Sequence, residues 1–356
     1  MANLYVTSGE TFSGKSALCL GLGARLRADG LRVGYMKPVN VNCPLLEGVA
    51  ADEDVAFARR AFEMDEPESL LLPVALTPAR LSHLLRGPEI DYEPRLLEAY
   101  AQVAAGRDLL ILEGGRSWRE GHVAHLPARR VVSLLEARVL LVLKHNQNVL
   151  ADRALAAQEY FGSSLLGVVI NETPADRIAP IREVLVPYLQ RHGLLVLGIL
   201  PRDPLLAAPT VAELAAGLHA EILCRADHTG DLVEHMMVGA MGLDAALTHF
   251  RRLADKAVIT GGDRADIQLA ALETSTRCLI LTGNMYPSPR VLSRADERGV
   301  PVLLTDVDTL QAVESVESFL GRSRFQEPQK VERFRTILDA NLNMPALYES
   351  LDLPAR

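Results

Sequence analysis

The sequence contains little cysteine. Its 356 residues include four cysteines, Cys19, Cys43, Cys224 and Cys278, and no two of them form a C-x-x-C pair. Scattered single cysteines indicate a reducing compartment and argue against a disulfide framework or a structural zinc site. We therefore interpret all four as small buried hydrophobic side chains.

The chain also lacks an excess of positive charge and a long apolar run. Its formal net charge is −8, which provides no global positive field for a nucleic-acid backbone or an anionic membrane. No uncharged apolar run is long enough to span a membrane, and the N-terminus has no signal-peptide pattern. We expect a soluble cytoplasmic protein without nucleic-acid or membrane partners, in which any anionic ligand is held by a local site.

What the sequence does contain is a complete phosphate-binding loop. Gly9-Glu10-Thr11-Phe12-Ser13-Gly14-Lys15-Ser16 matches G-x-x-x-x-G-K-[ST], and it lies between the apolar run Leu4-Tyr5-Val6 and the apolar helix predicted from Ala17 to Leu26. In such a loop the backbone N–H groups face an anion, Lys15 reaches the β- and γ-phosphates, and the Ser16 hydroxyl ligates Mg²⁺. The pattern predicts binding of ATP and Mg²⁺ through Gly9, Thr11, Ser13, Gly14, Lys15 and Ser16.

Short apolar runs alternate with longer helical patterns through the first 200 residues. Buried parallel strands are predicted at Arg32–Met36, Leu109–Glu113, Val139–Leu143, Gly167–Asn171 and Leu195–Leu200. Segments such as Val149–Phe161 and Ile178–His192 are long enough for crossover helices. These patterns predict a doubly wound α/β domain with a mostly parallel sheet, whose ligands bind beyond the carboxyl ends of the strands.

A second, smaller α/β domain is predicted after Pro201, Pro204 and Pro209, which interrupt the first pattern. Its predicted helices are Val211–Leu218, Leu243–Leu253, Ile267–Glu273, Arg290–Glu297 and Thr309–Leu320. Its predicted strands are Ile222-Leu223, Met236–Val238, Lys256–Thr260, Cys278–Thr282 and Val302–Leu304. We expect domains over residues 1–205 and 210–322, and a helical tail over 323–356 that packs across domains or subunits.

Charged side chains at predicted strand ends are the candidates for chemistry. Glu113 ends a buried strand, where a carboxylate suits a Mg²⁺ ligand or a water-orienting base, the alternative being a salt bridge. Lys37 also follows an interior strand, where an ammonium group is costly to bury unless it meets an anion such as a phosphate or a substrate. We assign Lys15, Lys37 and Glu113 as candidate catalytic residues. We expect the Lys15 side chain to face solvent when no nucleotide is bound.

Three further positions are ambiguous from pattern alone. Asp54 lies where a helix begins, and an acidic residue there is commonly no more than favourable to the helix dipole. Asn171 ends a strand and could pair with the edge of adenine or form a turn. His122 and His125 have a spacing that metal ligands use, but no third ligand accompanies them, and we interpret them as part of a solvated loop.

Taken in this order, the residues of the first half resemble the dethiobiotin synthetase family of P-loop enzymes. The resemblance covers residues 1 to about 200 and rests on Val6-Thr7-Ser8-Gly9, Gly14-Lys15-Ser16, Gly34-Tyr35-Met36-Lys37-Pro38-Val39, Asp54, Glu113-Gly114-Gly115 and Gly167-Val168-Val169-Ile170-Asn171. It implies that Ser16, Asp54 and Glu113 hold Mg²⁺. It also implies that Lys15 and Lys37 serve phosphate and carbamate, and that Asn171 reads adenine.

Two departures from that family concern the substrate. Phe12 stands where dethiobiotin synthetases usually have Glu, and Asn40-Val41-Asn42 replaces their Ser-Gly after Lys-Pro-Val. An apolar ring cannot accept a hydrogen bond, so a buried diamine would lose polar partners that it needs. We expect ATP binding without synthesis of dethiobiotin.

The second half resembles the DRTGG domain. The likeness rests on Asp227–Asp231, Met237–Met241, Ile259–Ile267 and Leu281–Gly283. The same pair of domains forms the N-terminal part of long bacterial phosphotransacetylases, and the sequence ends before an acyltransferase domain would begin. The resemblance implies an ATP-binding dimer whose DRTGG domain is a regulatory or effector-sensing module in acyl-phosphate and acetyl-CoA metabolism, without phosphate acetyltransferase activity of its own.

Two other functions stay open at this point. The first is an ATP-dependent carboxylating or ligating enzyme that acts on a small acid or amine. The second is an interaction subunit of a separate acyltransferase. The sequence does not decide whether ATP is hydrolysed or only sensed, so enzymatic activity itself is left open.

Within the second domain, Gly261–Arg264 and Asp227–Asp231 are the candidate contacts for a ligand or subunit. Both place glycine beside charged residues after short apolar runs, so their backbones can turn sharply and present N–H groups to an anion. Arg264 offers a planar donor fork that Asp263 could orient. The alternative is that Asp263 and Arg264 cap the following helix and pair with each other.

Overall fold

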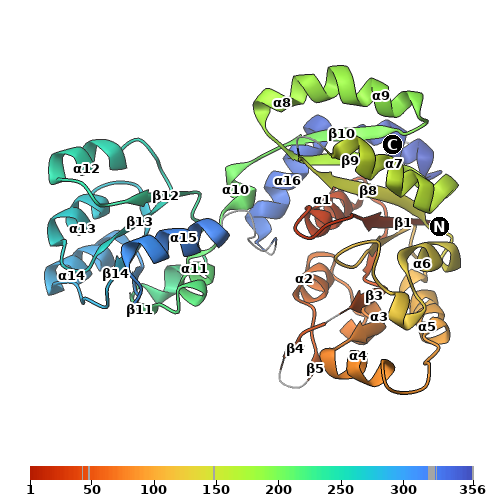
Figure 1. Ribbon diagram of the computed structural model, residues 1–356, viewed down its shortest axis with the longest axis horizontal. Coiled ribbons are helices and arrows are strands. Elements are labelled where there is room, and N and C mark those ends of the chain that lie inside the picture. Colours follow the sequence, from red (N-terminus) through yellow and green to blue (C-terminus); the bar gives the residue numbers. More distant parts are fainter. Residues whose placement is uncertain (42, 47–48, 147–148, 320–324, 326, 355–356) are drawn as a thin grey trace. The chain divides into compact units, whose positions relative to one another are not determined.

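The chain folds into two compact units in the computed structural model, which describes residues 1–41, 43–46, 49–146, 149–319, 325 and 327–354 (Figure 1). Unit 1 comprises Met1–Arg202 together with Phe325–Arg356, and unit 2 comprises Asp203–Arg324. Unit 2 is therefore an insertion, because the chain leaves unit 1, forms unit 2 and returns. Asn42 and the predicted helix end at Leu320 lie outside the described residues.

Unit 1 is built on a six-stranded parallel sheet in the order β10-β9-β8-β1-β7-β2. The strands are β1 (Ala2–Thr7), β2 (Val33–Met36), β7 (Leu109–Glu113), β8 (Arg138–Lys144), β9 (Leu165–Thr173) and β10 (Val196–Pro201). All five strands predicted between residues 32 and 200 are present, and the predicted doubly wound α/β fold is confirmed. The reason is that strands covered on both faces consist of continuous apolar runs, which the sequence shows directly.

The helices of unit 1 include several that the sequence did not reveal. They are α1 (Lys15–Ala28), α2 (Glu53–Ala61), α3 (Glu68–Leu71), α4 (Pro78–Leu84), α5 (Glu93–Ala104), α6 (Ala128–Leu134), α7 (Leu150–Phe161), α8 (Ala175–Pro180), α9 (Val186–Arg191), α16 (Pro328–Asn341) and α17 (Met344–Ser350). A turn of π-helix at Ile181–Leu185 joins α8 to α9 within the single predicted helix. Short strand pairs, β3 (Val39–Val41) with β6 (Val74–Leu76) and β4 (Leu45–Leu46) with β5 (Val49–Ala50), complete the unit.

The C-terminal helices close the face of the sheet on which α1 lies. The connection from β1 to β2 runs toward the β2 edge of the sheet, whereas the later crossovers run toward the β10 edge. Because such crossovers are right-handed, their helices cover the face opposite to α1. Helix α16 packs against α1 and β10. The backbone N–H of Asn343 then donates to the carbonyl of Leu197 at 2.7 Å. The tail is thus part of the core of unit 1.

Unit 2 has a five-stranded sheet in the order β11-β15-β14-β13-β12, with only β11 antiparallel. Its strands are β11 (Glu221–Cys224), β12 (His235–Val238), β13 (Lys256–Gly261), β14 (Thr276–Thr282) and β15 (Val302–Leu304). Its helices are α10 (Pro204–Ala207), α11 (Val211–Gly217), α12 (Leu243–Phe250), α13 (Ala265–Leu272), α14 (Pro289–Arg298) and α15 (Thr309–Phe319). The predicted small α/β domain is confirmed, although α12 ends three residues before the predicted helix does.

Two apolar cores cover the two faces of the unit 2 sheet. Helices α12, α13 and α14 bury residues such as Phe250 and Ile267 on one face. Helices α11 and α15 bury Leu214 and Val316 on the other face. Alternate residues of each strand feed the two cores, as a period of two requires.

The four cysteines are free thiols. Cys19, Cys43 and Cys278 are buried, as predicted, whereas Cys224 is only partly buried because it lies on the edge strand β11. In the part of the chain that the structure describes, no helix is both long enough and apolar enough to cross a membrane.

Candidate functional site

The phosphate-binding loop joins β1 to α1, as the sequence predicts. Gly14 immediately precedes α1 with a left-handed backbone, φ 89°. A Cβ atom on Gly14 would lie 2.1 Å from Nδ2 of Asn171, so both backbone and packing demand glycine there. Phe12 also adopts a positive φ of 53°, and its ring is exposed. Gly9 and Thr11 are exposed at the mouth of the loop.

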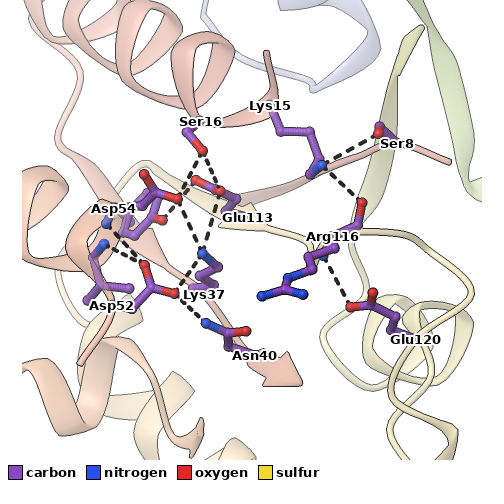
Figure 2. A network of polar contacts seen from close by, with 12 residues as sticks. Ser8, Lys15, Ser16, Lys37, Asn40, Asp52, Asp54, Glu113, Arg116 and Glu120 are labelled. Carbon is purple, nitrogen blue, oxygen red and sulfur yellow. Dashed lines mark hydrogen bonds and ion pairs between the residues drawn. The ribbon is translucent and has the colours of Figure 1, made fainter. Parts of the chain in front are cut away.

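Lys15 is buried, and the expectation that it faces solvent is wrong. Its ammonium lies 3.3 Å from the carbonyl oxygens of Glu10 and Arg116 and 3.5 Å from Oγ of Ser8 (Figure 2). Burial lowers the pKa of Lys15, and the charge of Glu113 opposes this shift. The loop after β7 thus helps to bury Lys15, because the carbonyl of Arg116 accepts a hydrogen bond from its ammonium.

Ser16, Glu113 and Asp54 meet at the N-terminus of α1. The hydroxyl oxygen of Ser16 lies 2.8 Å from Oε1 of Glu113 and 3.2 Å from Oδ2 of Asp54. Glu113 is 2% exposed at the end of β7, and Asp54 lies in the first turn of α2. The hydroxyl of Tyr35 donates to the other oxygen of Glu113 at 2.8 Å. Three segments far apart in sequence therefore bring together the oxygen atoms that hard cations such as Mg²⁺ prefer.

Lys37 faces three carboxylates in the same cluster. Its ammonium lies 2.7 Å from Asp52, 3.4 Å from Asp54 and 3.9 Å from Glu113. Burial alone would lower the pKa of Lys37, but these carboxylates outweigh burial and raise it. Burial likewise raises the pKa of Glu113 to about 6, with Lys37 opposing the shift. The cluster therefore keeps Lys37 charged beside the two carboxylates that flank Ser16.

Asp52 and Asn40 belong to the site, and the sequence analysis did not select them for chemistry. Asp52 is 7% exposed and caps α2, since its Oδ1 accepts from the N–H groups of Asp54 at 3.0 Å and Val55 at 3.3 Å. Its Oδ2 accepts from the amide of Asn40 at 2.6 Å as well as from Lys37. An Asp just before a predicted helix is an N-cap signal that could have identified Asp52. Asn40, noted only as a departure from a family pattern, positions this carboxylate.

Asn171 lies beneath the phosphate-binding loop. It is 6% exposed at the end of β9, and its side-chain amide donates to the carbonyl of Ser13 at 3.0 Å. The contact fixes the loop against the sheet, and the assignment of Asn171 to adenine stays a prediction. The hydroxyl of Ser13 is buried and makes no hydrogen bond with any described residue.

The two histidines lie in a short turn. They belong to the short 3₁₀ turn His122–Ala124 and the residue after it, and His125 is exposed beside Glu89 at 3.5 Å. No three His, Cys, Asp or Glu side chains within the described ranges gather to hold an ion by themselves. Mg²⁺ needs fewer protein ligands, because it keeps several waters and takes one or two carboxylates together with substrate phosphates.

In the candidate loops of unit 2, charged side chains already pair with neighbouring charged residues. Arg264 donates to the carbonyl of Met241 at 3.1 Å and pairs with Asp266 at 3.3 Å. Its pairing with Asp263, the alternative from sequence, is not among the ion pairs found in the described residues. A Cβ on Gly262 would lie 1.8 Å from the carbonyl oxygen of Met285, so the two neighbouring loops pack closely. An anion-binding role for Arg264 stays a prediction and requires that its pair with Asp266 loosen.

The fold and this site define a P-loop nucleotide-binding domain. A phosphate-binding loop follows the first strand of a doubly wound parallel sheet, and carboxylates converge on the serine that ends it. More particularly, the chain belongs to the family described as AAA domain, whose sequence model matches residues 2–210. The model of the DRTGG domain matches residues 213–319.

Similar proteins are phosphate acetyltransferases. That of Synechocystis sp. is 25% identical over 335 residues, which are 89% of this chain and 47% of that protein. That of Nitrosomonas europaea is 24% identical over 377 residues, 99% of this chain and 52% of that protein. That of Deinococcus radiodurans is 26% identical over 377 residues with the same shares, 99% and 52%. The chain thus spans about half the length of the curated relatives it matches.

Among solved structures, cobyrinic acid a,c-diamide synthase from Mycobacterium smegmatis with bound ADP and magnesium is 20% identical. The match covers 57% of this chain and 87% of that chain, with a TM-score of 0.37. The CBS and DRTGG domains of the regulatory region of Clostridium perfringens pyrophosphatase are 19% identical. That match covers 39% of this chain and 69% of that chain, with a TM-score of 0.29.

Proposed function

We propose that unit 1 binds ATP with Mg²⁺ and that unit 2 is a regulatory or effector-sensing module for it. The observation that carries the proposal is the position of the Ser16 hydroxyl. It lies 2.8 Å from Glu113 and 3.2 Å from Asp54, at the start of the helix that follows a complete phosphate-binding loop. A serine at this place in the loop is the residue type that ligates the metal of a bound nucleotide.

The residues of the site have distinct roles in this proposal. Backbone N–H groups of the loop and the ammonium of Lys15 bind the phosphates, while Ser16, Asp54 and Glu113 hold the metal. A Mg²⁺ ion held by these residues would supply positive charge that offsets the charge of the phosphates. Lys37 keeps its closest contact, to Asp52 at 2.7 Å, and in this proposal its ammonium interacts with an outer phosphate or an acceptor.

The path of the chain supports a regulatory role for unit 2. After unit 2 the chain continues into α16, which packs on α1, the helix that begins at Lys15. A change in unit 2 that moved α16 would therefore act on the helix that carries the phosphate-binding loop. We propose that the effector belongs to acyl-phosphate or acetyl-CoA metabolism and that the protein acts in the cytoplasm as a dimer. The relatives support the choice of effector, because they are phosphate acetyltransferases.

The buried Lys37 cluster favours a second candidate, an ATP-dependent ligase or carboxylase that acts on a small acid or amine. A charged ammonium fixed beside the outer phosphate could orient an acceptor carboxylate or carbamate. A biotin-pathway diamine is disfavoured, because Asn40 is already bonded to Asp52 and the ring of Phe12 offers no hydrogen bond. Release of phosphate that depends on an added acid or amine would favour the ligase over the sensor. Docking to a separate acyltransferase remains the third proposal.

The test is calorimetric titration of ATP into the full chain with Mg²⁺ present. We expect Lys15→Ala to weaken ATP binding by at least about tenfold, because a charge-assisted contact to phosphate is lost. The variant should remain folded, with a modest fall in melting temperature, since the hydrogen-bond partners of the Lys15 ammonium among the described residues are carbonyl and hydroxyl oxygens. Equal ATP affinity in the two proteins would contradict the proposal. A thermal-shift screen of metabolites in the presence of ATP would then identify effectors.

A further inference from the structure

The loop that follows β7 is fixed against the phosphate-binding loop by its backbone. Gly114 donates to the carbonyl of Val6 and Trp118 donates to that of Ser8, both at 2.9 Å. The N–H of Arg116 donates to Glu120 at 3.2 Å, and the carbonyl of Arg116 accepts from Lys15 at 3.3 Å. The backbone of Arg116 is therefore anchored one hydrogen bond away from the lysine that binds phosphate in P-loop proteins.

The side chain of Arg116, in contrast, makes no ion pair or hydrogen bond with any residue that the structure describes. It is exposed, and its guanidinium extends toward the side of the site where Lys37 and Asn40 lie (Figure 2). The acid nearest in sequence, Glu120, is used by the backbone of Arg116 and not by its side chain. Among the described residues, Arg116 thus offers an unpaired cation that extends from a hydrogen-bonded loop toward the side of the site where Lys37 lies.

The chemistry of the other cations indicates what this guanidinium binds. Lys37 is already matched by carboxylates, and Lys15 lies deep at the loop where the β-phosphate is held in such sites. A guanidinium offers a planar fork of donors that fits two oxygens of one phosphate. The guanidinium extends toward this side of the site, so it is the group that we assign to an anion held by Lys15.

We propose that Arg116 binds the outermost phosphate of the nucleotide and makes unit 1 distinguish a nucleoside triphosphate from a diphosphate. The inference rests on the proposed ATP binding and adds a contact that a diphosphate cannot make. Arg116 is thus a binding residue, and it connects the γ-phosphate to the loop after β7. The ligand class is a nucleoside triphosphate with Mg²⁺, and no partner chain is needed to complete the contact.

The experiment measures the affinities of ATP and ADP by calorimetry with Mg²⁺ for the full chain and two variants. Arg116→Ala should weaken ATP binding about tenfold, or about 1.4 kcal/mol, and change ADP binding less than about twofold. The matched control is Arg119→Ala, since Arg119 is also exposed on this loop but lies over the ring of Trp118 at 4.8 Å. The control should leave both affinities unchanged.

The outcomes separate this inference from the proposed function. If the unaltered protein binds both nucleotides and Arg116→Ala leaves the ratio of their affinities unchanged, the role of Arg116 is wrong while ATP binding stands. If the unaltered protein binds neither nucleotide, the proposed function is wrong and the inference with it. Equal melting temperatures of the two variants, expected for exposed side chains, would show that neither result comes from unfolding.

Discussion

At the residue scale, the charges of the site are unbalanced. Asp52, Asp54 and Glu113 lie around Lys37, and Lys15 is the other ammonium close enough to influence Glu113. Burial of an excess carboxylate is costly, and the pKa of Glu113, raised to about 6, reflects that cost. A divalent cation between Ser16, Asp54 and Glu113 would offset the excess negative charge, which is the physical reason to propose Mg²⁺ there.

Asp52 should support both the helix and Lys37. We expect Asp52→Ala to lower the free energy of unfolding of unit 1 by about 3 kcal/mol, because it removes the cap of α2 and the closest partner of a buried ammonium. Asp52→Asn keeps a capping oxygen and should cost about 1 kcal/mol less. Urea unfolding followed by the fluorescence of Trp118, the one tryptophan of the chain, measures unit 1. Equal effects of the two substitutions would show that the cap contributes nothing.

At the scale of elements, the glycines of α1 are explained by what packs on it. A Cβ on Gly21 would lie 2.6 Å from Cδ1 of Phe334 in α16, and one on Gly23 would lie 2.2 Å from the ring of Phe62. Glycine inside a helix costs roughly 1 kcal/mol relative to alanine. Here the two glycines permit close packing of α1, Gly21 against α16 and Gly23 against Phe62 at the end of α2.

Gly21→Ala should therefore destabilise unit 1, although alanine favours a helix. We expect a loss of about 1 to 2 kcal/mol, since the Cβ overpacks the contact with Phe334. Phe334→Leu made in the same chain should recover part of the loss caused by Gly21→Ala. A double-mutant cycle in urea, read from Trp118, gives the coupling between the two positions. Effects that add within about 0.5 kcal/mol would mean that α16 does not pack there.

Elements that are determined by a contiguous stretch of sequence could be predicted, whereas those that depend on contacts between distant segments could not. The strands of the main sheet are continuous apolar runs, and the P-loop is a contiguous motif, so both could be predicted. Strands of two or three residues, such as β3 and β4, are too short to show a period. The burial of Lys15 could not be predicted, because it depends on a loop about 100 residues away that folds back over the ammonium.

The candidate site shows the same limit. Ser16 could be identified from the P-loop motif and Glu113 from its place at the end of a predicted strand. Asp54 was ambiguous until the resemblance to a known family supported it. Asp52 and Asn40 were missed as site residues, because their roles appear only when β3 and α2 lie side by side around Lys37. Arg116 has no sequence signal of its own. Its place follows from the hydrogen bonds of the loop backbone.

For the whole molecule, the insertion of unit 2 between two parts of unit 1 is the feature that sequence analysis did not foresee. The tail was predicted as a separate helical segment that packs across domains or subunits, but α16 and α17 belong to unit 1. The complete set of candidate nucleotide and metal contacts lies in unit 1. Nucleotide binding can therefore be tested on the full chain without knowing the effector of unit 2.

The most direct test of the account is whether the full chain forms a complex with ATP and a divalent cation through Asp54 and Glu113. Mn²⁺ can replace Mg²⁺ because it prefers the same oxygen ligands. The relaxation rate of water protons reports Mn²⁺ that becomes bound to the slowly tumbling protein. The account predicts an enhancement that requires ATP, that Asp54→Asn and Glu113→Gln strongly reduce, and that the exposed control Glu98→Gln leaves unchanged. No enhancement in the unaltered protein, or equal enhancement in all four proteins, would contradict it.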